Sequence, residues 1–129
     1  MLLKGTYNTV QYEIALDTHE TILYGDSGIG KTFIFKSLDK EYNGMNVYKY
    51  TYQTDNDYMC DRIKSTNNAL FVLDRIELWL TPEMRQVIMS DKFNIFLIMG
   101  HDYWPLGRQE GSVKTLEFND SGILVARTL

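Results

Sequence analysis

The residues with the clearest chemical signature form one glycine-rich run. It consists of Gly25, Asp26, Ser27, Gly28, Ile29, Gly30, Lys31 and Thr32, and it fits the pattern G-x-x-x-x-G-K-[ST] at every defined position. In this pattern the glycines let backbone N–H groups turn toward phosphate oxygens, the lysine reaches the outer phosphates, and the last hydroxyl is offered to Mg²⁺. The sequence therefore predicts a loop that holds nucleotide phosphates, with Lys31 as a candidate catalytic residue and Thr32 as a metal ligand.

The elements that must position this loop can be read on both sides of it. Residues 21–24 form a short apolar run that ends at Gly25, as expected of a strand buried in a sheet. After the loop, Ile34, Phe35 and Leu38 recur at helical spacing. Strand, loop and helix thus follow in the order that the pattern requires. We take residues 25–32, with the adjoining Phe33, as the nucleotide-binding segment.

A metal-binding carboxylate is expected at the end of a second strand. Residues 70–73 are four apolar residues, and Asp74 follows them directly. A hydrated Mg²⁺ beside a phosphate-binding loop is held through such a carboxylate and the loop hydroxyl. Thr32 and Asp74 are therefore the predicted metal ligands.

Hydrolysis also needs a group that orients or deprotonates water. Arg75 directly follows Asp74, and Glu77 lies three residues beyond that aspartate. Glu77 faces either the same cavity or solvent, and an isolated glutamate is more often solvated. We keep Glu77 as the candidate catalytic carboxylate, whereas Arg75 favours binding without turnover.

The rest of the chain predicts further strands and helices. Apolar or alternating segments indicate strands at residues 12–16, 47–52 and 93–99, and hairpins near residues 3–16 and 113–127. Residues 54–68 support one short helix, and Thr81 followed by Pro82 indicates a capped helix that ends near Lys92. Strands separated by helical stretches predict an α/β fold: a mainly parallel sheet flanked by helices, with antiparallel hairpins at its N- and C-terminal edges.

Length and charge limit the classes of function. The chain has 129 residues, which favours a single domain spanning residues 1–129. Its net charge of -4 supplies no basic field for nucleic acid, so direct nucleic acid binding is not expected. Cys60 is the single cysteine, the first residues lack the apolar run of a signal peptide, and no stretch approaches the length of a membrane span. These features predict a cytoplasmic protein without a membrane span.

The order of these motifs resembles that of a P-loop NTPase, most like a stripped-down ABC-type or AAA-like ATPase core. Residues 20–32 are similar to the Walker A strand and loop of that family, and residues 70–74 to its Walker B strand. Gln53 stands where the Q-loop glutamine closes a strand, and His101 where a strand ends in the switch histidine. The resemblance implies a sheet of the P-loop NTPase type and ATP and Mg²⁺ as ligands. It also implies that Gln53 and His101 lie near the metal ion and the γ-phosphate.

The resemblance also bears on the base and on turnover. It implies that Tyr7 or Tyr12 stacks on adenine, and we take Tyr12 as the candidate. The chain has no Asn-Lys-x-Asp guanine motif, so ATP is expected rather than GTP. It departs from the family in lacking a Leu-Ser-Gly-Gly-type signature and the glutamate that commonly follows the Walker B aspartate. A transporter-style sandwich dimer and fast hydrolysis are therefore not implied.

Two polar residues near the C-terminal third have alternative interpretations. His101 is either a γ-phosphate sensor or a polar residue that closes a buried strand. Arg108 is either an arginine finger toward a neighbouring subunit or, as is more common, a solvated side chain. We keep His101 as a catalytic candidate.

Four hypotheses for the function remain open. The leading one is an ATP-binding protein with slow or partner-stimulated Mg²⁺-dependent hydrolysis, in which a protein partner or a second copy senses the nucleotide state. The alternative is a non-hydrolysing nucleotide-binding regulatory or assembly module. A small-molecule kinase would need an arginine-rich lid, and Arg62 stands alone in the middle segment. A DNA-linked ATPase is suggested by small size only and is opposed by the acidic charge.

Overall fold

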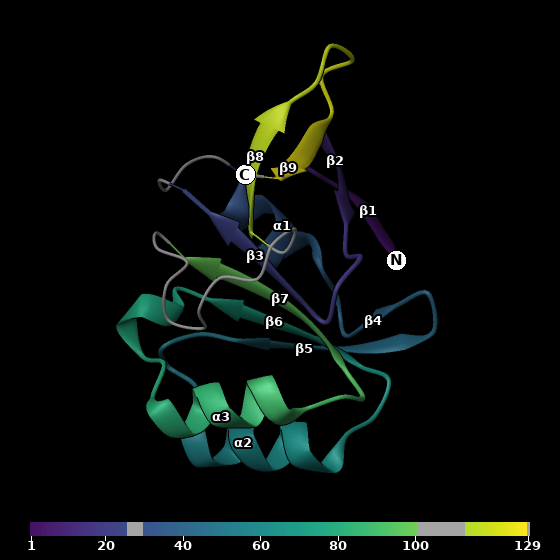
Figure 1. Ribbon diagram of the computed structural model, residues 1–129. Coiled ribbons are helices and arrows are strands. Elements are labelled where there is room, and N and C mark those ends of the chain that lie inside the picture. The colour runs from purple at the N-terminus through teal and green to yellow at the C-terminus, as the bar shows by residue number, and fades with distance from the viewer. Residues whose placement is uncertain (26–29, 101–112, 129) are drawn as a thin grey trace.

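One nine-stranded sheet runs through the described part of the chain, which is residues 1–25, 30–100 and 113–128 of a computed structural model (Figure 1). Its strands are β1 (Leu2–Tyr7), β2 (Val10–Ala15), β3 (Glu20–Tyr24), β4 (Glu41–Tyr42), β5 (Met45–Tyr50), β6 (Leu70–Asp74), β7 (Ile95–Gly100), β8 (Val113–Phe118) and β9 (Leu124–Thr128). The helices are α1 (Lys31–Ser37), α2 (Asn56–Ser65) and α3 (Pro82–Ser90), with a 3₁₀ turn, η1 (Ile76–Leu78). The strand order is β1-β2-β9-β8-β3-β7-β6-β5-β4.

The sheet is mixed. Parallel pairs join β3 to β7 and β8, β6 to β5 and β7, and β2 to β9. Antiparallel pairs join β1 to β2, β8 to β9, and β4 to β5. Because β3, β6 and β7 run in the same direction, their carboxyl ends meet at one edge of the sheet, where Gly25, Asp74 and Gly100 lie.

The predicted fold class is wrong. Instead of a helix-flanked, mainly parallel sheet of P-loop NTPase type, the structure is a strand-rich domain in which 42% of the described residues are in strands and 26% in helices. The sheet is curled, and the helices α1, α2 and α3 have only seven, ten and nine residues. The C-terminal hairpin is not an edge: β8 and β9 lie inside the sheet, between β3 and β2.

A buried lysine links β8 to the end of β2. Lys114 is 3% exposed, and its ammonium group donates hydrogen bonds to the Ala15 carbonyl oxygen at 2.9 Å and to Asp17 Oδ1 at 3.2 Å. Burying an ammonium group without such partners is costly. The same hydrogen bond lowers the pKa of Asp17. Alternation of residue types along the C-terminal hairpin does not reveal its contact with β2, so the sequence predicts an edge position for this hairpin.

Most individual elements agree with the sequence. The helix expected after Thr81 is α3: Thr81 Oγ1 accepts a hydrogen bond from the Met84 amide at 3.2 Å, and Pro82 occupies the first turn. The helix expected within residues 54–68 is α2, and it begins after Asp55, whose side chain accepts from the Tyr58 amide at 2.9 Å. These elements are confirmed because their signals are local.

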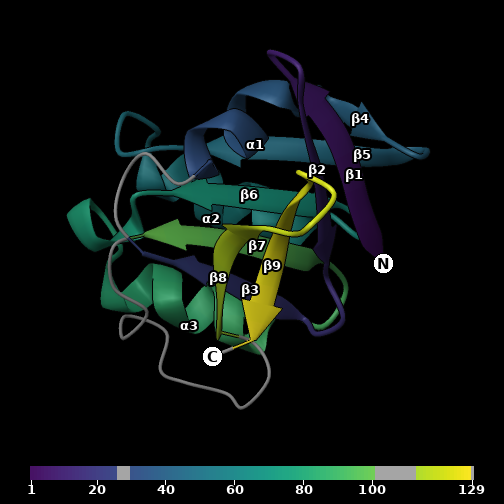
Figure 2. The same cartoon turned by 90° about the horizontal axis from the view of Figure 1, so that it is seen from above.

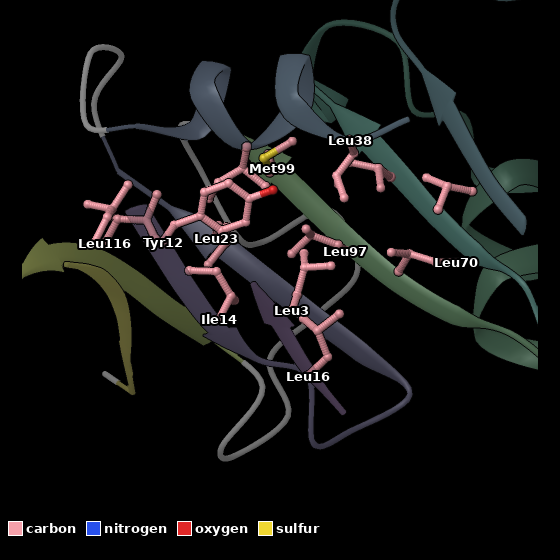
Figure 3. Close-up of a cluster of buried hydrophobic side chains, with 14 residues drawn as sticks. Leu3, Tyr12, Ile14, Leu16, Leu23, Leu38, Leu70, Leu97, Met99 and Leu116 are labelled. Carbon is pink, nitrogen blue, oxygen red and sulfur yellow. The ribbon is translucent and has the colours of Figure 1, made fainter. Parts of the chain in front are cut away.

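Two hydrophobic clusters cover the two faces of the sheet. On one face, Ile34 of α1 and its C-cap residue Leu38 pack with β1, β2 and the central strands. Figure 3 shows Leu3, Ile14, Leu97 and other residues of this cluster. On the other face, α2 and α3 lie side by side (Figure 1), over stacked Phe71 and Phe96 rings whose centroids are 5.4 Å apart.

The curl brings the two edge strands of the sheet together. The Tyr42 hydroxyl of β4 accepts a hydrogen bond from the Lys4 amide at 2.8 Å and donates one to the Leu2 carbonyl at 3.2 Å, so β4 touches β1. Seen from above, β1 and β2 lie on the same side of the molecule as α1 and β4 (Figure 2). One side of the helix that follows the glycine-rich loop is thus covered by strands, whereas Thr32 and Lys36 remain exposed.

Gly5 makes room for a tyrosine ring, and we expect Gly5→Ala to destabilise the protein by about 1–3 kcal/mol. A Cβ atom at Gly5 would overlap the Tyr12 ring and hydroxyl, which lie opposite it across β1 and β2. Chemical denaturation measures the effect. In a Tyr12→Leu background the same substitution should cost little. Gly44→Ala is the control: its neighbourhood is open but its φ is +78°, so its cost should be equal in both backgrounds. Equal costs for Gly5→Ala would contradict this account.

Candidate phosphate-binding site

The glycine-rich loop joins the end of β3 to the start of α1. Gly25, with φ 140°, follows β3, and Gly30 is the N-cap of α1 with φ 89°. A Cβ atom at Gly30 would also overlap the Leu124 side chain, so both backbone conformation and space require glycine there. Asp26, Ser27, Gly28 and Ile29 lie outside the described residues.

Lys31 is buried at the meeting point of two strand ends. It is 8% exposed, and its ammonium group donates hydrogen bonds to the carbonyl oxygens of Gly25 and, at 3.1 Å, of Gly100. Those carbonyls follow or close β3 and β7, which are parallel neighbours. A lysine held in this way places a positive charge at the base of the loop, where the sequence predicts phosphate.

A cavity of about 350 Å³ brings together residues from three separate parts of the chain. It is lined by Thr32, Phe35 and Lys36 of α1, by Thr51, Tyr52 and Gln53 after β5, and by Asp74 and Arg75 at the end of β6. Three of the predicted site residues, Thr32, Gln53 and Asp74, therefore share one cavity. Thr32 and Gln53 are exposed, and Asp74 is partly buried.

Asp74 is held in a desolvated position. Burial raises the pKa of its carboxyl group above the usual value, while the Arg75 charge and backbone amide, and more weakly Lys31, act to lower it. The Trp79 indole N–H donates to the Asp74 carbonyl oxygen at 2.7 Å, which fixes the end of β6. The carboxylate is therefore positioned by its neighbours, at some electrostatic cost.

The residues present fit Mg²⁺ that is shared with phosphate. Among residues 1–25, 30–100 and 113–128, no group of three or more His, Cys, Asp or Glu side chains could hold a metal alone. Mg²⁺ is commonly bound by one or two protein ligands, with substrate phosphates and waters completing its octahedral shell. Thr32 and Asp74 supply such a pair.

Arg75 also lines the cavity, and the sequence did not predict this position for its side chain. Its backbone is left-handed, with φ 55° and ψ 48°, which is uncommon for a residue with a side chain and is often found at functional sites. Lys36 adds a second cation. The spacing of Thr32 and Lys36, one helical turn apart, could have indicated that they share a face.

Glu77 is not part of this cavity. It lies on η1 and lines a different cavity of about 620 Å³, together with Leu80 and Arg85. Its charge nevertheless acts on Asp74, whose pKa it raises, so Glu77 lies outside the cavity but within electrostatic reach of that carboxylate.

The structure also separates the two tyrosine candidates. Tyr12 is 2% exposed within the core, and its hydroxyl contacts Ser37 Oγ, so its ring is unavailable to stack on a base. Burial of the hydroxyl raises its pKa. Tyr7 instead packs against the partly exposed Phe33, with ring centroids 5.5 Å apart. Of the two, Tyr7 is the one beside the predicted binding segment.

Two predicted residues cannot be placed in the site. The described part of β7 ends at Gly100, so His101 and Arg108 lie outside the described residues.

Comparison with known proteins does not supply a family for the chain. No family model matches it, and no curated protein sequence matches it. Within the described ranges, no helix is long and apolar enough to cross a bilayer.

We expect Asp74→Asn to raise the stability of the free protein at pH 7. A raised pKa in the folded state means that folding disfavours the charged carboxylate, and asparagine removes that charge. The stability gap should narrow as the pH falls through the folded-state pKa of Asp74, because the wild-type carboxyl group then becomes neutral too. Urea denaturation of both proteins from pH 7 to pH 4 measures the gap. A variant less stable than the wild type at pH 7 would contradict this interpretation.

Proposed function

We propose that this chain binds ATP together with Mg²⁺, using the loop at residues 25–32 and the adjoining cavity. One observation carries the proposal: Thr32, Gln53 and Asp74, far apart in sequence, line one cavity next to the loop. The proposal extends to a single nucleotide-binding domain over residues 1–129, functionally similar to P-loop NTPases in its loop and its aspartate. The proposal does not depend on the architecture of the sheet, which differs from that of P-loop NTPases.

Charge supports an anionic ligand. Among the described residues, Lys36 and Arg75 line the cavity and Lys31 lies at the base of the loop, whereas Asp74 is the one carboxylate that lines the cavity. This local excess of positive charge occurs in a chain whose net charge is -4. A triphosphate would neutralise it, and backbone N–H groups of a glycine-rich loop are suited to phosphate oxygens.

Thr32 and Asp74 would hold the metal ion. The Thr32 hydroxyl and the Asp74 carboxylate are oxygen ligands of the kind that Mg²⁺ prefers. The ion neutralises phosphate charge when it is bound. Gln53, at the mouth of the same cavity, would contact the metal-bound waters or the terminal phosphate, and Tyr7 with Phe33 offers an aromatic surface for the base.

Turnover would be slow or would depend on a partner. Among the residues that the structure describes, Asp74 is the only carboxylate that lines the cavity. A carboxylate engaged with the metal is a poor acceptor for a proton from water. A protein partner or a second copy would then supply the missing group, or sense the nucleotide state.

A specific observation favours a second candidate, a regulatory or assembly module that binds ATP without hydrolysing it. Arg75 occupies the position after Asp74 and lines the cavity, so it would contact the terminal phosphate rather than activate water. Direct nucleic acid binding is not part of either candidate. A cytoplasmic location is proposed from the composition, since the single cysteine forms no internal disulfide.

Lys31→Ala should reduce the affinity for Mg²⁺-ATP by about 30-fold or more, as expected when a charge-assisted contact worth about 2 kcal/mol is lost. Calorimetry measures it, with Lys64→Ala, an exposed lysine of α2, as the charge-matched control. Lys31 is buried, so its substitution could also affect folding, and Thr32→Ala serves as a second variant. Thr32 is exposed, and its substitution should remove the Mg²⁺ dependence of ATP binding without affecting the fold.

Acidic pH should weaken Mg²⁺-ATP binding before an ordinary aspartate would titrate. The metal needs the charged carboxylate, and the raised pKa of Asp74 means that this form is lost at a higher pH than usual. The absence of any binding heat for the wild type at pH 7.5 would overturn the proposed function.

Arg75→Ala should lower the affinity for ATP by about 10-fold and leave the affinity for ADP unchanged, because only ATP carries the terminal phosphate. Calorimetry with both nucleotides, together with phosphate release, makes the test. Equal losses for ATP and ADP would contradict a terminal-phosphate contact. Phosphate release by the wild type well above that of Lys31→Ala would contradict the second candidate and favour an ATPase.

A further inference from the structure

A groove of about 640 Å³ lies along the outer edge of β5, and neither proposed function uses it. β4 pairs with β5 only at Met45 and Asn46, so the described sheet ends at β5 over residues 47–50. The lining comes from both sides of this edge. It consists of Leu38, Asp39 and Lys40 after α1, Tyr58 of α2, and residues 46–50 between them. We call it the β5 groove.

The backbone of β5 presents open hydrogen-bonding groups at this edge. The Val47 amide points away from β6, because it donates to the Lys40 carbonyl oxygen at 2.8 Å. Alternate residues of a strand direct their backbone groups to the same side, so the Lys49 amide and carbonyl also point outward. Among the described residues, no hydrogen bond joins either group to another element on that side. Such an edge can accept a further strand.

The charges on the α1 side of the groove favour an acidic occupant. Lys40 and Lys49 line the groove, and Asp39 is the one carboxylate among its described lining residues. The Lys49 ammonium group is held in place, because it donates to the Phe35 carbonyl oxygen at 3.0 Å. Lys40 is exposed. This side of the groove is therefore positively charged, in a chain whose net charge is -4.

A third cation lies on the α2 side. The Arg62 guanidinium group lies over the rings of Tyr48 and Tyr58, at 5.0 and 5.4 Å from their centroids, and both tyrosines line the groove. It also donates a hydrogen bond to the Tyr58 hydroxyl at 2.8 Å, and that tyrosine is 52% exposed. Successive side chains of an extended segment point to opposite faces. One would therefore meet the two lysines, and the next would meet Arg62.

We infer that the β5 groove binds an extended, acidic segment of a protein partner, which adds a strand to the sheet at Lys49. Its carboxylates would lie against Lys40, Lys49 and Arg62. A second copy of the chain fits less well, because pairing two β5 edges would bring the lysines of both copies together. The inference does not depend on nucleotide binding, because no residue lines both this groove and the cavity that contains Asp74.

The test uses the full chain and three synthetic peptides as probes. The first is acetyl-Val-Glu-Val-Glu-Val-amide, the second has glutamine in place of both glutamates, and the third is the first peptide with a methyl group on every backbone nitrogen. NMR titration of the ¹⁵N-labelled protein measures each affinity. We expect the glutamine peptide to bind roughly fivefold more weakly or worse, because it lacks the charge. The methylated peptide should not bind, because it has no backbone donors.

Hydrogen exchange locates the added strand. A peptide paired with β5 accepts a hydrogen bond from the Lys49 amide. At a concentration about ten times its Kd, the acidic peptide should therefore slow exchange of that amide about tenfold. The Tyr48 amide is the internal control, because it points toward β6 and should change little.

Two adjacent residues give effects of opposite sign. Asp39 and Lys40 are both exposed and both line the groove. Lys40→Gln should weaken binding of the acidic peptide by about two- to fivefold, whereas Asp39→Asn should strengthen it by about twofold. Lys92→Gln is the matched control, because Lys92 is exposed and does not line this groove. It should bind like the wild type.

Lysines on a sheet edge can instead serve to keep other strands away. That role predicts that the acidic peptide does not bind, which would overturn the inference. Equal binding of the acidic peptide and either control peptide would also overturn it, as would unchanged exchange at Lys49 or equal effects of Lys40→Gln and Lys92→Gln. So would sedimentation showing a dimer that the acidic peptide dissociates, since the occupant would then be a second copy. The signal dispersion of each variant verifies that it is folded.

Discussion

The site depends on one constraint: a helix of seven residues must be held at a fixed place beside the glycine-rich loop. An isolated helix of this length is not stable in water. α1 is instead held because Ile34 and the C-cap residue Leu38 are buried in the cluster that β1, β2 and the central strands share. The Tyr42 hydroxyl connects the edge strands β4 and β1 around it. The curl of the sheet thereby fixes Lys31 and Thr32, the first two residues of α1.

The parallel strands supply the rest of the site. β3, β7 and β6 end at the same edge of the sheet, so the loop, Gly100 and Asp74 are neighbours. The electrostatic cost of burying charged groups is concentrated at this edge too. Lys31 is buried against carbonyl groups, and Asp74 is desolvated. Groups with perturbed electrostatics cluster at functional sites. Stability and binding are therefore expected to respond in opposite directions to changes at Asp74.

The sequence predicted what local patterns determine. The glycine-rich loop, the apolar run before Asp74, and the Thr81-Pro82 start of α3 all depend on neighbours in the chain, and Thr32 and Asp74 do share a cavity. Long-range pairing was not predictable. Nothing around Lys114 indicates that it reaches Ala15, nor that β9 pairs with β2.

The burial of individual side chains was equally unpredictable from the sequence. The alternation around Tyr12 predicts that one face of its strand is buried, but not that the ring fills the space over Gly5 and is closed off from any ligand. In the same way, spacing alone put Glu77 three residues from Asp74 and could not show that η1 turns it into a separate cavity. The 3₁₀ turn η1 determines which cavity the Glu77 side chain lines. This turn begins after the left-handed backbone of Arg75, which residue types alone do not reveal.

That turn decides what the site can do chemically. Asp74 is the only described carboxylate in its cavity, so it can hold a metal ion or accept a proton from water, but it cannot efficiently do both. Arg75, at the start of the turn, adds a positive charge that would stabilise a bound phosphate in the ground state as well as during its transfer. Contacts of equal strength in both states increase affinity without increasing the rate. Under the proposed function, the geometry of this cavity would therefore favour retention of a triphosphate over its hydrolysis, and turnover would require a group brought by another molecule.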